Sequence, residues 1–143
     1  MTFESWAKRP LRVLVIDDSD LARAHLCAIA SSAGMEVFEQ TSAIGATRTI
    51  LRNEIEVVIV DISMPGLSGD RLIQLLRDNK RFARLAIVVV SAKPAGELAE
   101  FEKALAVDAV LSKERAEAEL SPLLRELQAR LRNVSYGQVN GHA

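Results

Sequence analysis

The chain has 143 residues, 26% of them charged, and a formal net charge of −1, which are typical of one soluble globular domain. The near-zero charge gives no general attraction for nucleic acid, and no apolar stretch is long enough to span a membrane. A single cysteine, Cys27, excludes an internal disulfide, and residues 1–9 lack the apolar core of a signal peptide, so we expect a cytoplasmic protein.

Strand-like and helix-like segments alternate along the chain. Short apolar, β-branched runs predict five strands, at residues 11–16, 35–39, 56–60, 85–90 and 109–111. The segments between them predict helices at residues 21–33, 43–52, 70–79 and 95–105. Such alternation is typical of an α/β, doubly wound parallel sheet with helices on both faces.

The last helix is predicted from leucines at helical spacing, and its start is open. Ser121 and Pro122 fit an N-cap and a first helical position, which would leave residues 114–120 as a separate turn. Alternatively, Pro122 lies inside one longer, distorted helix. We expect a domain at 11–132, an N-terminal arm at 1–10 that Trp6 packs against the domain, and a flexible tail at 133–143.

Polar side chains follow four of the five predicted strands, at the point where each strand ends. Asp17 and Asp18 follow the first strand, Asp61 the third, Ser91 the fourth and Lys113 the fifth. Because the carboxyl ends of parallel strands form the ligand crevice of an open sheet, these side chains should converge. Three carboxylates repel one another unless a cation holds them, so the pattern predicts a site for a hard divalent metal and a phosphoryl group.

In this order, the acidic pair, Asp61 with the loop after it, Ser91-Ala92-Lys93 and Lys113 resemble the receiver domain of bacterial two-component response regulators. The resemblance covers roughly residues 11–132 and implies the flavodoxin-like receiver fold, with strand order 2-1-3-4-5. It implies a phosphoacceptor rather than an enzyme. Such a protein takes a phosphoryl group from a histidine kinase or a histidine phosphotransfer protein, and assists its own magnesium-dependent phosphorylation and dephosphorylation.

The resemblance also assigns the metal site. Asp61 would be the phosphoacceptor, and Asp18 and Asp61 would bind Mg²⁺ directly, with Mn²⁺ as the alternative ion. Asp17 would act mostly through a water, and Ser63 would contribute its backbone carbonyl. Asp17 or Asp18 could instead merely cap the first helix. Pro65, Gly66 and Gly69 are expected only to shape the loop.

Four further positions concern the phosphoryl group. Ser91 and Lys113 would bind its oxygens, and movement of the Ser91 hydroxyl would be the switch. Ser63 and Lys93 stand at the two positions that tune the lifetime of the phosphoryl group in the family. Neither supplies a carboxylate or amide that could orient an attacking water.

The chain departs from the family pattern at two output positions. Val110 stands where the family usually has an aromatic residue, three positions before the lysine. The switch therefore has no large aromatic side chain to rotate. Glu114 replaces the proline that usually follows the lysine, so we expect a trans bond there and a rearranged turn, because a cis bond before a non-proline residue costs about 3 kcal/mol.

The expected function is that of a single-domain response regulator that signals through protein contacts to an unknown downstream protein. The first helix would dock the phosphate donor, and the face made by the 95–105 helix, the fifth strand and the last helix would bind the output partner or form a homodimer. The alternative is an interaction module on a receiver fold that works without phosphorylation. A flavodoxin-like nucleotide binder is disfavoured, because an acidic turn, not a glycine-rich phosphate loop, follows the first strand.

Overall fold

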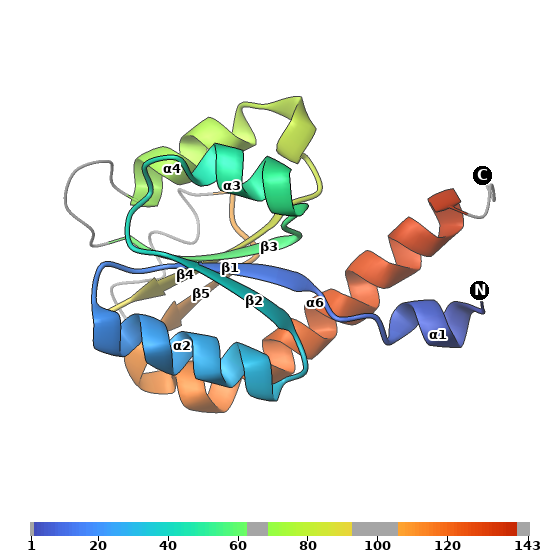
Figure 1. The fold of residues 1–143 in the computed structure, drawn as a ribbon, viewed down its shortest axis with the longest axis horizontal. Helices are drawn as coiled ribbons and strands as arrows, with labels where there is room; N and C mark the ends of the chain where they lie inside the picture. Colours follow the sequence, from blue (N-terminus) through green and yellow to red (C-terminus); the bar gives the residue numbers. More distant parts are fainter. Residues whose placement is uncertain (1, 63–68, 93–105, 140–143) are drawn as a thin grey trace.

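A five-stranded parallel sheet forms the centre of the molecule (Figure 1). The computed structural model describes residues 2–62, 69–92 and 106–139. Its strands, in their order across the sheet, are β2 (Glu36–Gln40), β1 (Arg12–Ile16), β3 (Val57–Asp61), β4 (Ala86–Ser91) and β5 (Ala109–Ser112). The predicted fold class and the strand order 2-1-3-4-5 are therefore confirmed.

Helices cover both faces of the sheet (Figure 1). On one face lie α2 (Asp20–Ser32) and α6 (Ala116–Val139), and on the other lie α3 (Ala46–Asn53) and α4 (Gly69–Arg77), followed by the short 3₁₀ turn η1 (Lys80–Phe82). The helix predicted at 95–105 lies outside the described residues. None of the helices in the described ranges is both long and apolar enough to cross a membrane.

Alternating side chains of the central strands fill two apolar layers. Val13 and Val15 of β1 point into the layer under α2 and α6, whereas Leu14 and Ile16 point into the layer under α3 and α4. All five residues of β3 are buried, which explains why that strand is a continuous apolar run ending in a carboxylate. Burial of each such side chain contributes about 1.5–3 kcal/mol, so the end of β3 is firmly fixed.

The N-terminal arm packs against the domain, as predicted, and is itself partly helical. The short helix α1 (Phe3–Ala7) lies beside α6 in Figure 1. Its Trp6 donates a hydrogen bond from Nε1 to the backbone oxygen of Arg132, over 2.8 Å. The guanidinium groups of Arg9 and Arg132 lie 5.0 and 5.4 Å from the centre of the Trp6 rings.

The prediction of a flexible tail from residue 133 is wrong for residues 133–139, because these residues continue α6. The rings of Phe3 and Tyr136 pack edge to face, with their centroids 5.1 Å apart. Helix α1 therefore supports the last turns of α6. This contact links the two ends of the chain, and a local reading of a polar, glycine-containing sequence does not reveal it.

Pro122 lies inside one long helix, so the second of the two alternatives for the last helix is correct. Proline has no backbone N–H, so residue 122 donates no hydrogen bond to the carbonyl of Ala118. Such a proline costs about 3 kcal/mol in a helix interior. Leu120 and Leu124 on either side are fully buried and offset this cost. The Lys113–Glu114 bond is trans, as predicted, and the 3₁₀ turn η2 (Lys113–Arg115) leads into α6.

Candidate functional site

Three carboxylates converge at the carboxyl edge of the sheet. Asp61 is the last residue of β3, and Asp17 and Asp18 follow β1 directly. One oxygen from each of the three lies within 4.8 Å of the others. Asp17 is fully buried and Asp61 is 4% exposed, whereas Asp18 faces solvent. The site thus concentrates negative charge at an edge that solvent reaches from the side of Asp18.

Lys113 is the cation of this cluster. Its Nζ lies 2.9 Å from Oδ2 of Asp17 and donates a hydrogen bond to Oδ2 of Asp61 over 3.3 Å. Partial burial lowers the pKa of Lys113, but contact with Asp17 and the charges of Asp61 and Asp17 outweigh it, so the net pKa is raised. The lysine therefore stays charged, yet one ammonium neutralises only one of the three carboxylates.

The residues present fit a hard divalent cation. Oδ2 of Asp17 is buried and accepts no aligned hydrogen bond from the described residues, despite its ion pair with Lys113. Lys113 gives this oxygen one cationic contact, but the cluster keeps an excess of negative charge that a divalent cation would neutralise. Carboxylate oxygens are the donors that Mg²⁺ prefers, and Mg²⁺ usually takes one or two of them together with water and phosphate oxygens.

The loop after β1 holds Asp17 in place. Its Oδ1 accepts a hydrogen bond from the backbone N–H of Ser19 over 2.9 Å, and its backbone oxygen accepts one from Nη1 of Arg23, also over 2.9 Å. The N-cap of α2 is Ser19, whose hydroxyl accepts from the N–H of Ala22. The alternative in which Asp17 or Asp18 merely caps this helix is therefore wrong.

The family model for the response regulator receiver domain matches residues 13–125, which are well over half of the chain. The chain belongs to this family. The family's residues thus extend from β1 into α6, and they include the acidic pair, Asp61 and Lys113. Residues of α1 and the last turns of α6 lie outside the matched range.

Two curated relatives illustrate how receivers occur in longer proteins. A gliding motility regulatory protein from Myxococcus xanthus is 32% identical over 85 residues, which are 59% of this chain and 11% of that protein. A protein-glutamate methylesterase/protein-glutamine glutaminase from Archaeoglobus fulgidus is 30% identical over 132 residues, which are 91% of this chain and 38% of that protein. The chain thus spans well under half the length of these curated relatives.

A solved receiver with a bound metal has the same fold. The receiver domain of a sensor histidine kinase from Pseudomonas aeruginosa, with a magnesium ion coordinated in its active site cleft, superposes with a TM-score of 0.73 at 21% identity. The match covers 84% of this chain and 98% of that one. At this identity the likeness shows the fold alone.

The remaining predicted site residues are placed as follows. Ser91 ends β4, is fully buried and stands beside Ser112 in the register of β4 and β5. Val110 pairs with Val89 and packs half-buried against the layer under α3 and α4, and Glu114 is exposed in η2. Ser63 and Lys93 lie outside the described residues, so the carbonyl ligand and the lifetime positions remain predictions.

Gly69 contributes to this receiver's site in a way that the sequence did not reveal. It begins α4, and a Cβ atom added there would stand 2.7 Å from the backbone oxygen of Asp61 and 2.8 Å from Cα of Ile62. Only glycine permits this approach, because real Cβ contacts with backbone atoms do not become so short. The start of α4 therefore packs directly against the backbone that carries the candidate phosphoacceptor.

We expect Gly69→Ala to destabilise the fold by about 1–2 kcal/mol, because the backbone after Asp61 must shift to admit the methyl group. Urea unfolding of the full chain measures this change. Gln74→Ala, at an exposed position of the same helix, is the control and should leave the free energy of unfolding within about 0.5 kcal/mol. An alanine variant as stable as the wild type would show that the contact is not tight in solution.

Proposed function

We propose that this receiver accepts a phosphoryl group on Asp61 from a histidine kinase or a histidine phosphotransfer protein, and signals by contacts with another protein. The observation that supports this most directly is the position of the Asp61 carboxylate. It stands at the end of a fully buried strand, among two further carboxylates, with the Lys113 ammonium 3.3 Å from its Oδ2. Two anionic neighbours and one cation match the needs of a phosphoacceptor that works with a divalent metal.

The proposed transfer is a single displacement at phosphorus. A carboxylate oxygen of Asp61 forms the new O–P bond while the P–N bond to the donor histidine breaks, and the imidazole nitrogen keeps the electron pair. Because the transition state is loose, placement of charge carries most of the catalysis. The Lys113 ammonium would pair with a phosphoryl oxygen as a point charge, and the Ser91 hydroxyl would donate to another.

Asp17, Asp18 and Asp61 would hold Mg²⁺, with the carbonyl of Ser63 as a further ligand that we infer from the family resemblance. When bound, the ion neutralises negative charge on the phosphoryl oxygens. The burial of Asp17 Oδ2, whose partner among the described residues is the single Lys113 ammonium, and the presence of one oxygen from each carboxylate within 4.8 Å of the others support this assignment. Mn²⁺ satisfies the same oxygen donors and is the alternative ion.

The test is incubation of the full chain with acetyl phosphate, with and without Mg²⁺, followed by intact-mass measurement. We expect one added phosphoryl group in the presence of Mg²⁺, located on Asp61 after reduction with borohydride and peptide mapping. Labelling that proceeds equally well in EDTA, or that maps to another residue, would contradict the proposal.

Binding of Mg²⁺ should raise the thermal stability of the receiver, because it relieves the repulsion among the clustered carboxylates. At a Mg²⁺ concentration ten times the Kd, the free energy of unfolding rises by about 1.4 kcal/mol. This corresponds to a rise in Tm of roughly 4 °C for a domain of this size. Calorimetry with increasing Mg²⁺ measures the shift. Asp18→Asn should reduce it, and Asp78→Asn, at an exposed position outside the cluster, should leave it unchanged. No shift at saturating Mg²⁺ would indicate a degenerate site.

The phosphoryl group should be lost slowly, because neither Ser63 nor Lys93 can orient an attacking water and Lys93 adds positive charge. Decay after removal of the donor, followed on phosphate-affinity gels, measures the lifetime. Lys93→Glu and Ser63→Asn should shorten it. If the wild type decays faster than both variants, the reasoning about these two positions is wrong.

A second candidate is an interaction module that works without phosphorylation. Val110 favours it, because a half-buried valine packed under α3 and α4 has no ring to move when Ser91 moves. In that case, the surface that we propose for the output partner or a homodimer would keep one conformation whether or not Asp61 is phosphorylated. Pull-down of partners with the phosphorylated and unphosphorylated chain separates the two candidates, since only the phosphoacceptor predicts a difference.

A further inference from the structure

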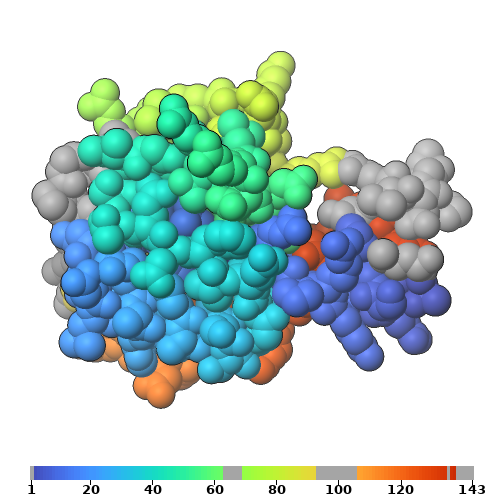
Figure 2. All heavy atoms as spheres, in the orientation of Figure 1, coloured from blue at the N-terminus to red at the C-terminus, as the bar shows by residue number. Residues whose placement is uncertain are grey.

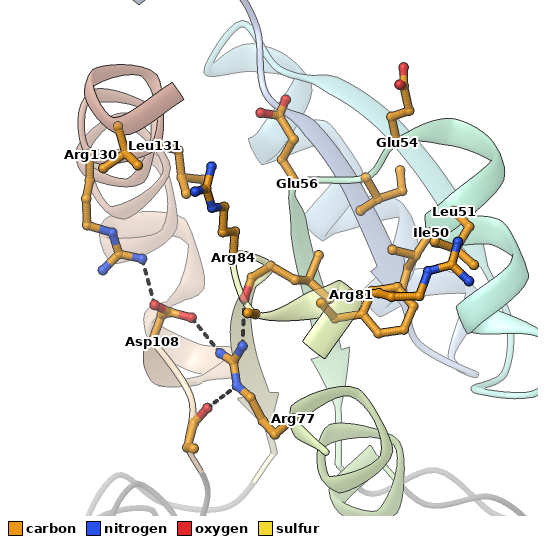
Figure 3. Close-up of a pocket in the computed structure, with 16 residues that line it drawn as sticks. Ile50, Leu51, Glu54, Glu56, Arg77, Arg81, Arg84, Asp108, Arg130 and Leu131 are labelled. Atoms are coloured by element: carbon orange, nitrogen blue, oxygen red, sulfur yellow. Dashed lines mark hydrogen bonds and ion pairs between the residues drawn. The ribbon is translucent and has the colours of Figure 1, made fainter. Parts of the chain in front are cut away.

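A groove of about 720 Å³ opens at the edge of the sheet opposite Asp61, where the strands begin (Figure 3). Ile55 and Glu56 precede β3 in its lining, and Leu85 precedes β4. The C-terminal end of α3 forms one wall, and residues 130–134 of α6 form the other. Figure 3 shows Leu51 on the first wall and Leu131 on the second.

The groove combines a buried apolar floor with an exposed apolar rim. The floor is made by four side chains that are at most 7% exposed: Ile50, Ile55, Phe82 and Leu85. At the rim, Leu51 is 44% exposed and Val134 is 51% exposed, and both are large apolar side chains. Exposed apolar surface that continues into a concave floor is typical of a ligand site rather than of an ordinary surface.

Every acidic side chain in the lining already has a cationic partner. Glu54 pairs with Arg12 over 2.9 Å, and Glu56 accepts two hydrogen bonds from Arg132. Asp108 pairs with Arg77 over 3.1 Å and with Arg130 over 2.6 Å, as the dashed lines in Figure 3 show. The negative charges of the groove are therefore neutralised before any ligand arrives.

Two further arginines stand in the lining. The guanidinium of Arg81 makes no ion pair or hydrogen bond within the described ranges, although its backbone N–H donates to Oδ1 of Asn79, and its side chain lies toward the wall that carries Leu51. Arg84 follows it and extends toward α6 on the other side of the groove (Figure 3). The Arg81 guanidinium therefore presents positive charge next to apolar surface, and this charge defines the chemistry of what the groove can bind.

We propose that this groove binds a small amphipathic anion, with an aromatic or branched apolar body and one carboxylate, sulfonate or phosphate group. The body would cover Phe82 and Leu51, and the anionic group would pair with Arg81, beside Arg84. The volume lies within the range of about 300–1,000 Å³ that is usual for small-ligand sites. This site is separate from the cluster around Asp61, and the inference does not depend on phosphorylation.

The test uses 1-anilinonaphthalene-8-sulfonate, which has an aromatic body and one sulfonate, and its uncharged analogue N-phenyl-1-naphthylamine. A fluorescence titration of the folded, full chain should show saturable binding of the sulfonate at one site. Arg81→Gln should weaken this binding about tenfold or more, since a charge-assisted hydrogen bond contributes about 1.5–3 kcal/mol. The uncharged analogue should bind more weakly and be insensitive to Arg81→Gln.

Two exposed arginines outside the groove supply matched controls, Arg48→Gln on α3 and Arg125→Gln on α6, and neither should change the affinity. Leu51→Ser should weaken binding of both probes because it removes apolar contact. Amide chemical-shift mapping should place the perturbations at residues 50–56, 81–85 and 130–134. Perturbations elsewhere, equal binding of the two probes, or equal losses in Arg81→Gln and Arg125→Gln would overturn the proposal.

Discussion

Replacing Asp61 by asparagine should abolish phosphoryl labelling while leaving the receiver as stable as the wild type, or more stable. The amide of asparagine is not a nucleophile, so no acyl phosphate can form. The substitution also removes one of three carboxylates that lie within 4.8 Å of one another, and two of these share a single lysine. Loss of labelling with retained stability would separate a chemical role of Asp61 from a structural one.

Intact-mass measurement after acetyl phosphate treatment gives the labelling, and urea unfolding gives the stability. Asp78→Asn, at an exposed position after α4, is the matched control and should be labelled like the wild type. An Asp61→Asn protein that still gains a phosphoryl group would remove Asp61 as the acceptor. A protein that is not labelled because it has lost its structure would show instead that the buried carboxylate is needed for folding.

The convergence of the acidic site followed from the sequence for a simple reason. A strand buried on both faces appears as an apolar run, and the residue that ends the run lies at a known edge of a parallel sheet. Asp17, Asp61 and Lys113 could therefore be brought together without coordinates. Strand β3 shows this most directly, since all five of its residues are buried and the last of them is Asp61.

Contacts between segments that are distant in the sequence could not be predicted in this way. The packing of Phe3 on Tyr136 joins segments near the two ends, and the approach of Gly69 to the backbone of Asp61 is likewise set by packing in three dimensions. Neither contact leaves a periodic signal. The same holds for Arg132, which looked like the end of the domain and is instead 95% buried, on a helix that continues to Val139.

Arg132 joins three segments of the chain. Its guanidinium donates hydrogen bonds to both carboxylate oxygens of Glu56, which precedes β3, and to the backbone oxygens of Arg9 and Pro10. Its backbone oxygen accepts the hydrogen bond from the indole of Trp6. A bidentate pair of this kind is geometrically specific, and lysine cannot reproduce it.

Arg132→Met should lower the free energy of unfolding by about 2–3 kcal/mol. Removal of one partner of a buried pair costs about 3–5 kcal/mol, and we expect less here because the Glu56 side chain remains 28% exposed and can be partly hydrated. Urea unfolding measures the loss. Arg125→Met, at an exposed position of the same helix, should change stability by less than about 0.5 kcal/mol.

The double variant Arg132→Met/Glu56→Met distinguishes a lost ion pair from lost packing. If the cost comes from the stranded Glu56 carboxylate, removing that charge as well should recover at least about 1 kcal/mol. Trp6 is the chain's single tryptophan and packs on this arginine, so its fluorescence should show that the arm is released in Arg132→Met. Unchanged tryptophan emission with a loss below about 1 kcal/mol would mean that Arg132 does not hold the arm to the domain.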